Sequence, residues 1–333
     1  MDSKTVTAFL GNALSARADL FDVQHKAAFR LFNGFYEGYP DLVVDVYART
    51  LVIHNYADPP EDSLAQVNAA RNFLHSSLPW LRTVILKTRN APNLEERCGV
   101  VIEGSAPDRK IREHHVWYAL DLTMHRDASL YLDTRHLRAW AIDNLIGKTA
   151  LNTFAYTGSL GVAAMGGGAK RVVHMDINRN FLNIAKTSYT LNGFPIVKKD
   201  FISSDFFPGV ARLKRTGTLF DCVFLDPPYF STTAMGTVDM LAQGKRLINK
   251  VRPLVADDGW LVAVNNALFL NGQEYLSMLE ELCADGYLRI ESLVPVPEDF
   301  TGYPGTRVGE FVTDPAPFNH PTKIAILKVK RKS

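Results

Sequence analysis

The chain of 333 residues has few cysteines, no long apolar run and little net charge. Cys98, Cys222 and Cys283 are scattered and odd in number, so they exclude a disulfide framework and offer no metal-ligand spacing. No apolar run approaches the length of a membrane span, and the first residues lack the layout of a signal peptide. We therefore expect a cytoplasmic protein, in a reducing compartment, with no membrane partner.

Histidines offer no metal site either. Of nine histidines, only His114 and His115 are adjacent, in a segment that resembles a strand. Neighbours on a strand point to opposite faces, so the two cannot bind one ion together. We predict no metal site.

The charge balance allows a nucleic-acid partner without requiring one. The formal net charge is +2 at pH 7. A strong phosphate-binding surface usually shows as clustered Lys and Arg, whereas the basic tail KVKRKS is typical of a solvated chain end.

Residues 1–125 predict a small α+β domain. Apolar residues have helical spacing from Thr5 to Arg30, and a hairpin turns at Tyr47–Thr50. The other expected elements are a helix over Ser63–Ser77 and strands over Thr83–Lys87, 99–104 and 115–122.

Residues 126–333 predict a second domain in which strands and helices alternate. The expected strands are 151–156, 171–176, 196–202, 221–226 and 259–264, and the expected helices are Leu160–Met165, Asn180–Thr190, Val210–Lys214, Val238–Val255 and Gln273–Ala284. Such alternation is typical of a parallel sheet with helices on both faces. The closing strands, Leu288–Val294 and Lys323–Val329, have no helix between them and predict an antiparallel edge pair. The fold class is therefore α/β, with a Rossmann-like, seven-stranded, mostly parallel sheet preceded by a small α+β domain.

The most specific motif is FDCVFLDPPYF, residues 220–230. Its apolar run predicts a buried strand, and Pro227 and Pro228 end that strand directly after Asp226. In open α/β sheets, ligands bind at the carboxyl ends of strands. We expect Asp226, Pro227, Pro228 and Tyr229 to form a catalytic group; the alternative is a stiff loop with core aromatics.

Two weaker signals precede this motif. Gly158 and Gly161 follow a predicted strand, where glycine allows a tight turn and a close approach of backbone N–H groups to a ligand, or simply close packing. Asp176 ends the next strand, where a carboxylate can accept hydrogen bonds from ribose hydroxyls. The alternative for Asp176 is a helix cap, a role that Asn178 fills equally well.

Taken together, these motifs resemble the class I S-adenosylmethionine methyltransferases and, more closely, the large-subunit ribosomal-RNA methyltransferase I and K group. The similarity runs over nearly the whole chain, through FRLFNGFYEGYPDLVVDVY, LKTR, YLDTR, NTFAYTGSLG, SSDFF, FDCVFLDPPYF and FNHPTKIAILKV, in order. It implies S-adenosyl-L-methionine as cofactor and RNA, ribosomal RNA above all, as partner.

The resemblance also implies a set of site residues. Thr157 and Gly158 with their neighbours would hold the methionine part of the cofactor, Asp176 the ribose and Asp205, rather than Asp200, the adenine amine. The cofactor set is Thr134, Arg135, Asn152, Phe154, Tyr156, Thr157, Gly158, Asp176, Ile177, Asn178, Ser204, Asp205, Phe206 and Asp226, and the substrate set is Phe230, Asn265 and Asn266.

The chain departs from the family pattern in two respects. Relatives often carry an N-terminal pseudouridine-synthase-like RNA-binding module that this sequence is expected to lack, which leaves RNA recognition to residues 1–125. Methylation of cytosine at carbon 5 ordinarily needs a cysteine nucleophile. Family members that do this chemistry carry the cysteine in one of two segments, which here read VNNALF and DPPYF and contain none. Cys222 and Cys283 fall within a predicted strand and a predicted helix.

We therefore expect methylation of a ring or exocyclic nitrogen of an RNA base without a cysteine nucleophile. Asn265–Asn266 resembles the guanine-N7 branch, and DPPY resembles the loop of amino-group methyltransferases. A small-molecule methyltransferase, a cytosine-C5 RNA methyltransferase and a cofactor-binding RNA-associated protein without catalysis are the alternatives. The sequence does not tell which nucleotide is modified, whether the RNA is ribosomal or transfer RNA, or whether the chain forms a homodimer.

Overall fold

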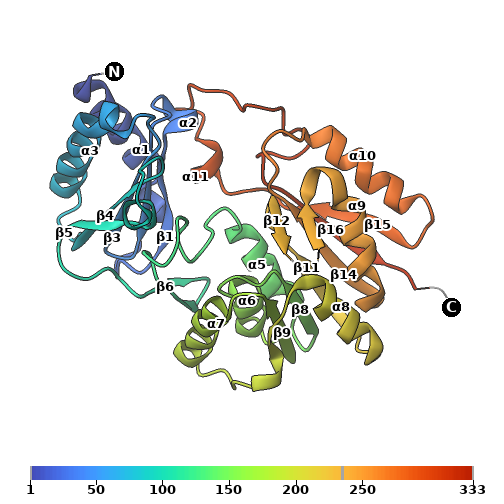
Figure 1. Cartoon of the computed structure of the whole chain (residues 1–333). Helices are drawn as coiled ribbons and strands as arrows, with labels where there is room; N and C mark the ends of the chain where they lie inside the picture. The colour runs from blue at the N-terminus through green and yellow to red at the C-terminus, as the bar shows by residue number, and fades with distance from the viewer. Residues whose placement is uncertain (1, 234–235, 332–333) are drawn as a thin grey trace. The chain divides into compact units, whose positions relative to one another are not determined.

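A computed structural model of the chain describes residues 2–233 and 236–331, and their side chains outside 230–243. The chain divides into two compact units (Figure 1). The first comprises Met1–Leu132 and Pro297–Glu310, and the second Asp133–Val296 and Phe311–Ser333. The domain boundary expected after residue 125 thus lies inside the first unit, which also includes the late segment 297–310.

The first unit is built on a five-stranded sheet in the order β1-β2-β3-β4-β5. The strands are β1 (Ala28–Asn33), β2 (Leu42–Tyr47), β3 (Thr50–Asn55), β4 (Thr83–Thr88) and β5 (Val100–Glu103). Helices α1 (Ser3–Ala16) and α3 (Leu64–Ser77) share one apolar core with alternate strand residues, such as Leu51 and Ile53. The remaining α-helices are α2 (Gly34–Glu37), α4 (Leu94–Cys98) and α11 (Glu298–Thr301), and β6 (Lys110–Glu113) and β7 (Val116–Ala119) form a separate hairpin.

Two expectations for this unit were wrong. The helix expected to reach Arg30 ends at Ala16, where the fully buried Arg17 pairs with Glu37 at 2.9 Å; the next apolar residues form β1 instead. His114 and His115 lie in the turn between β6 and β7, with φ angles of 48° and 68°, and not on a strand. Among the described residues, no three His, Cys, Asp or Glu side chains gather as a metal site.

The second unit holds a seven-stranded sheet in the order β10-β9-β8-β11-β14-β16-β15, which confirms the predicted fold class. The strands are β8 (Thr149–Thr153), β9 (Arg171–Asp176), β10 (Phe201–Ser203), β11 (Phe220–Leu225), β14 (Val255–Asn265), β15 (Leu288–Leu293) and β16 (Lys323–Val329). From β10 to β14 neighbours are parallel, and β16 is antiparallel to both of its neighbours. The strand order reverses between β8 and β11, and ligands of such sheets bind at the carboxyl ends beside this point.

Helices cover both faces of this sheet (Figure 1). Helices α5 (Arg135–Asn144), α6 (Ser159–Gly166) and α7 (Arg179–Asn192) pack near β8 and β9. Helices α8 (Phe206–Arg215), α9 (Met240–Val251) and α10 (Gly272–Cys283) share a core cluster with the strands on the other face. Within the described ranges, no helix is both long and apolar enough to span a bilayer.

Among the differences from the expected element boundaries, three are the largest. The strand expected over 196–202 is reduced to β10, because Lys198–Asp200 forms a 3-10 turn. The helix expected to reach Val255 ends at Val251, before a 3-10 turn containing Pro253, whose nitrogen cannot continue the helical bonds. A hairpin that was not expected, β12 (Phe230–Thr233) and β13 (Gly236–Asp239), follows the double proline.

Candidate functional site

The structure brings most of the predicted site residues to one edge of the second unit's sheet. Because β8, β9, β10, β11 and β14 are parallel, the segments after them all lie at the carboxyl edge. These segments contain Asn152 to Gly158, Asp176 to Asn178, Ser204 to Phe206, Asp226 to Tyr229, and Asn265 with Asn266. Thr134 precedes α5 and Arg135 begins it. Phe230 begins β12, and its side chain is outside the described ones.

The turn after β8 is held by Asp176 at the end of β9. Phe154, Tyr156 and Gly158 have φ angles of 51°, 50° and 80°, a conformation that only glycine adopts without cost. The Asp176 carboxylate accepts hydrogen bonds of 2.8 Å from the backbone nitrogens of Tyr156 and Asn178. Burial raises the pKa of this half-buried carboxyl. Asp176 therefore shapes the turn in addition to presenting an acceptor at the sheet edge.

The glycines of this turn have a packing role. A Cβ atom at Gly161 would lie 2.4 Å from His174 Cε1, and one at Gly158 would lie 2.6 Å from Ala185 Cβ. His174 is fully buried in β9 with Nε2 3.0 Å from the Tyr189 hydroxyl, and burial lowers its pKa to about 3. Gly161 is thus needed for α6 to approach β9.

The two aspartates near β10 differ in their partners. Asp200 is buried and accepts two hydrogen bonds from Arg171, at 3.0 and 2.6 Å. Asp205 caps α8, accepting from the Phe207 nitrogen at 3.0 Å, while Phe206 stacks on Phe154 at 4.7 Å between ring centroids. Arg171 occupies Oδ1 of the buried Asp200, whereas Asp205 lies at the start of α8 beside Phe206, so Asp205 stays the candidate acceptor at this edge.

Asp226 is the most perturbed acid at this edge. Burial raises the pKa of its carboxyl to about 7, and the negative charge of Asp133 adds to the effect. Asp133 itself accepts a hydrogen bond of 3.0 Å from the Thr322 hydroxyl. Pro227 is buried, whereas Tyr229 is 44% exposed. At neutral pH, Asp226 can therefore either donate or accept a proton beside an exposed aromatic ring.

Polar atoms with unused hydrogen-bonding capacity lie at the end of β14. Asn265 accepts from the Ala267 nitrogen at 2.9 Å, but Asn265 Nδ2 and Asn266 Oδ1 are buried with no partner among the described residues. A buried polar atom without a partner costs about 1–3 kcal/mol. A ligand that accepts from one amide and donates to the other removes this cost.

Lys323 is a residue of this edge that sequence reasoning missed. It is fully buried opposite Asn265 in the β14–β16 pair, and its ammonium donates to the carbonyl oxygens of Ala267 at 3.0 Å and Pro321 at 2.6 Å. Burial lowers its pKa to about 8. The available signal was a lysine immediately before the apolar run IAIL of this strand. Lys323 fixes the two loops that flank the asparagine pair.

The residues at this edge suit a nucleoside cofactor that carries a positive charge. Asp176 offers carboxylate oxygens, and the adjacent Ile177 is 60% exposed and can contact a flat base. The turn between Phe154 and Gly158 presents backbone groups beside them. S-Adenosylmethionine has ribose hydroxyls, an adenine and a sulfonium that match these features.

Comparison with known proteins supports S-adenosylmethionine as the cofactor. A family model described as S-adenosylmethionine-dependent methyltransferase matches residues 29–298. YwbD of Bacillus subtilis, described as a ribosomal RNA large subunit methyltransferase, is 28% identical over 87% of this chain and 74% of its own length. Ribosomal RNA large subunit methyltransferase I of Photobacterium profundum is 27% identical over 76% of this chain, which spans only 62% of that relative.

Solved structures share the fold. A protein described as a methyltransferase complexed with SAH superposes with a TM-score of 0.85 at 20% identity, over 99% of this chain and 82% of the other. A SAM-dependent methyltransferase from Streptococcus mutans has a TM-score of 0.83 at 18% identity, with the same coverage.

Proposed function

This chain belongs to the family of S-adenosylmethionine-dependent methyltransferases, and from that membership we propose that its substrate is a base in RNA, methylated at a nitrogen atom. Two relatives that it matches over 74% and 62% of their lengths are described as ribosomal RNA large subunit methyltransferases. Ribosomal RNA is therefore the first substrate to test.

Residues at the carboxyl edge would hold the cofactor, which supplies an electrophilic methyl group on a positively charged sulfur. Asp176 accepts hydrogen bonds from the ribose, Ile177 contacts the adenine, and Asp205 accepts from the adenine amine. Backbone groups at Thr157 and Gly158 bind the methionine part. Thr134 and Arg135 close over the cofactor from the start of α5.

The observation that carries the proposal is Asp226, with its pKa raised to about 7 by burial, beside the exposed Tyr229. On an exocyclic amine, the Asp226 carboxylate accepts a hydrogen bond from N–H and takes the proton that leaves as the new nitrogen–carbon bond forms. A ring nitrogen has its own lone pair and needs no base. Tyr229 stacks on the flipped base, an interaction worth about 1–3 kcal/mol per base.

The asparagine pair gives this base its hydrogen-bonding partners. Asn265 Nδ2 can donate and Asn266 Oδ1 can accept, and neither has a partner among the described residues. The edge of a nucleobase carries both donors and acceptors, so it can use one free donor and one free acceptor.

The state of the cysteines supports nitrogen as the target. Cys222 is fully buried in β11, and burial raises the pKa of its thiol far above the ordinary value. Burial also raises the pKa of Cys283. A cysteine nucleophile must be a thiolate with access to the base, and these thiols are held protonated.

The test is transfer of tritiated methyl from S-adenosylmethionine to total RNA from a strain lacking this protein, followed by nucleoside mass spectrometry. We expect label in ribosomal RNA, on a nitrogen-methylated nucleoside. The variant Cys98→Ser/Cys222→Ala/Cys283→Ser should retain transfer. Label only in a small-molecule extract, or 5-methylcytidine lost in the cysteine-free variant, would contradict the proposal.

A further inference from the structure

A groove lined by cations runs along the edge strand β10 of the second unit. Its volume is about 750 Å³, and it lies between α7, the 3-10 turn before β10, and α8. Its cationic side chains are Arg179, Lys186, Lys198, Lys199 and Arg212. Its floor is apolar, from Leu182, Phe201, Ile202 and Leu213. We call this feature the basic groove.

Positive charge in the basic groove is uncompensated. Residues 179–216 contain seven Lys and Arg against two Asp. Of these two, Asp200 is paired with Arg171, which lies outside the groove lining, and Asp205 caps α8. For the five lining cations, the structure records no ion pair within the described residues. The local excess of positive charge is far larger than the net charge of +2 of the whole chain suggests.

The basic groove adjoins the residues assigned to the adenosine end of the cofactor. Ser203 lines the groove and lies opposite Asp176 in the register of the neighbouring strands β10 and β9. Arg179, which also lines the groove, directly follows Asn178 in the sequence. From β10 to β11, which precedes Asp226, there are three strand spacings. At about 4.8 Å each, this distance is about 14 Å, which a few nucleotides of RNA can span.

We propose that the basic groove binds the phosphodiester backbone of the RNA whose base is methylated at Asp226. This inference rests on the proposed function and assigns it a binding surface within the catalytic unit. Lysines and arginines beside a groove with an apolar floor are the arrangement expected for single-stranded nucleic acid. An acidic peptide added as a strand is less suited, because β10 offers only three residues, Phe201–Ser203, for pairing.

The proposal is tested by fluorescence anisotropy of a labelled 20-nucleotide single-stranded RNA with the full chain, over a series of salt concentrations. In single strands each neutralised phosphate contributes about 0.7 to the slope of log affinity against log salt. Lys198→Gln/Lys199→Gln should therefore lower the slope by about 1.4 and weaken binding at low salt at least about tenfold. Adding Arg212→Gln should lower it by about 0.7 more.

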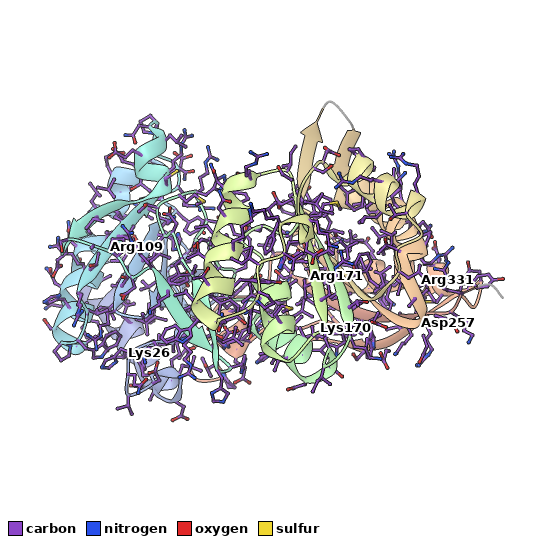
Figure 2. The ribbon with its side chains drawn as sticks, turned by 90° about the horizontal axis from the view of Figure 1, so that it is seen from below. Lys26, Arg109, Lys170, Arg171, Asp257 and Arg331 are labelled. Atoms are coloured by element: carbon purple, nitrogen blue, oxygen red, sulfur yellow. The ribbon has the colours of Figure 1, made fainter. Side chains whose placement is uncertain are left out.

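The control, Arg289→Gln/Lys330→Gln, removes the same charge at the other end of the sheet. Arg289 is exposed on the edge strand β15, and Lys330 follows β16 beside Asp257, at 3.2 Å. Figure 2 labels Asp257 and Arg331 in that region, apart from Arg171 at the start of β9. We expect the wild-type slope in this variant. Thermal melting and calorimetry with S-adenosylmethionine should give wild-type values for all variants, because the substituted side chains are exposed.

Several results would overturn the proposal while leaving the proposed function intact. One is that the groove variants methylate RNA with the wild-type KM and bind it with the wild-type salt slope. In that case the only role of the cations would be to prevent the edge strand from pairing with the sheet of another molecule. Another is displacement of the RNA by free ATP or by a polyglutamate peptide at equal phosphate or carboxylate concentration. Failure of the proposed function itself is distinct: RNA receives no methyl group from the wild-type chain.

Discussion

Asp133 raises the pKa of Asp226, although the two acids lie on segments far apart in the sequence. Asp133 precedes α5 and accepts a hydrogen bond from the Thr322 hydroxyl, and Asp226 follows β11. Burial is the larger cause of the raised pKa of Asp226, and the charge of Asp133 adds to it, because like charges disfavour each other's ionisation.

For Asp133→Asn we predict a lower pKa of Asp226. If an exocyclic amine is the target, the ionised form of Asp226 is the active one, so wild-type kcat should rise with pH through about 7. In Asp133→Asn this inflection should move to lower pH, because the second charge is gone. A pH–rate series measures it, with Thr322→Val as the control that removes the hydrogen bond and keeps the charge. A rate that does not change around pH 7 would instead indicate a ring nitrogen.

Replacement of Asp226 separates catalysis from cofactor binding. In Asp226→Ala, methyl transfer should fall by about 10²–10⁴-fold, the usual contribution of a positioned acid or base. Asp176 and Asp205 remain, so the Kd for S-adenosylmethionine in calorimetry should change little. A variant that methylates at the wild-type rate would show that the acid before the twin prolines is not catalytic.

Replacement of Asp176 should have the converse effect. Asp176→Ala removes the ribose acceptor and the acceptor for the Tyr156 nitrogen, which holds the turn after β8. Hydrogen bonds to a charged group are worth about 1.5–3 kcal/mol, so the Kd for S-adenosylmethionine should rise about 10–100-fold. Asp176→Asn keeps an acceptor for Tyr156 and should lose less affinity. Equal loss in both variants would show that shaping the turn is not part of its role.

The sequence predicted the seven-stranded sheet of the second unit better than it predicted the basic groove. The alternation of strands and helices and the run before Asp226 are local patterns, and both predict the seven-stranded sheet. The roles of Lys323 and Asp133 depend on long-range contacts, with Ala267 and with Thr322, which no spacing in the sequence reveals. The basic groove escaped notice for the same reason, since its cations come from three separate elements.

Gly161 should not tolerate a side chain. In Gly161→Ala the new methyl group would meet His174 Cε1 at 2.4 Å and Val172 Cγ1 at 2.7 Å in a packed core, so we expect a loss of about 1–3 kcal/mol in unfolding free energy. Gly244→Ala is the matched control in another helix, where the nearest atom is Met278 Cε at 3.6 Å; it should gain about 0.5–1 kcal/mol. Urea unfolding of both variants measures the difference, and equal stabilities would contradict the packing role.

The raised pKa of Asp226 also predicts a pH-dependent cost to stability. As pH rises from about 4, the unfolded chain releases this proton at its ordinary pKa of 3.8, while the folded chain keeps it until about 7. The folded state therefore binds the proton more tightly, and its stability falls across this window and stays lower above it. Asp226→Asn mimics the protonated acid and avoids the loss. We expect its melting temperature to match the wild type near pH 4 and to exceed it by about 4 °C at pH 8. If the two melting temperatures differ by the same amount at every pH, the pKa of Asp226 is not raised on folding, and the site holds no proton at neutral pH.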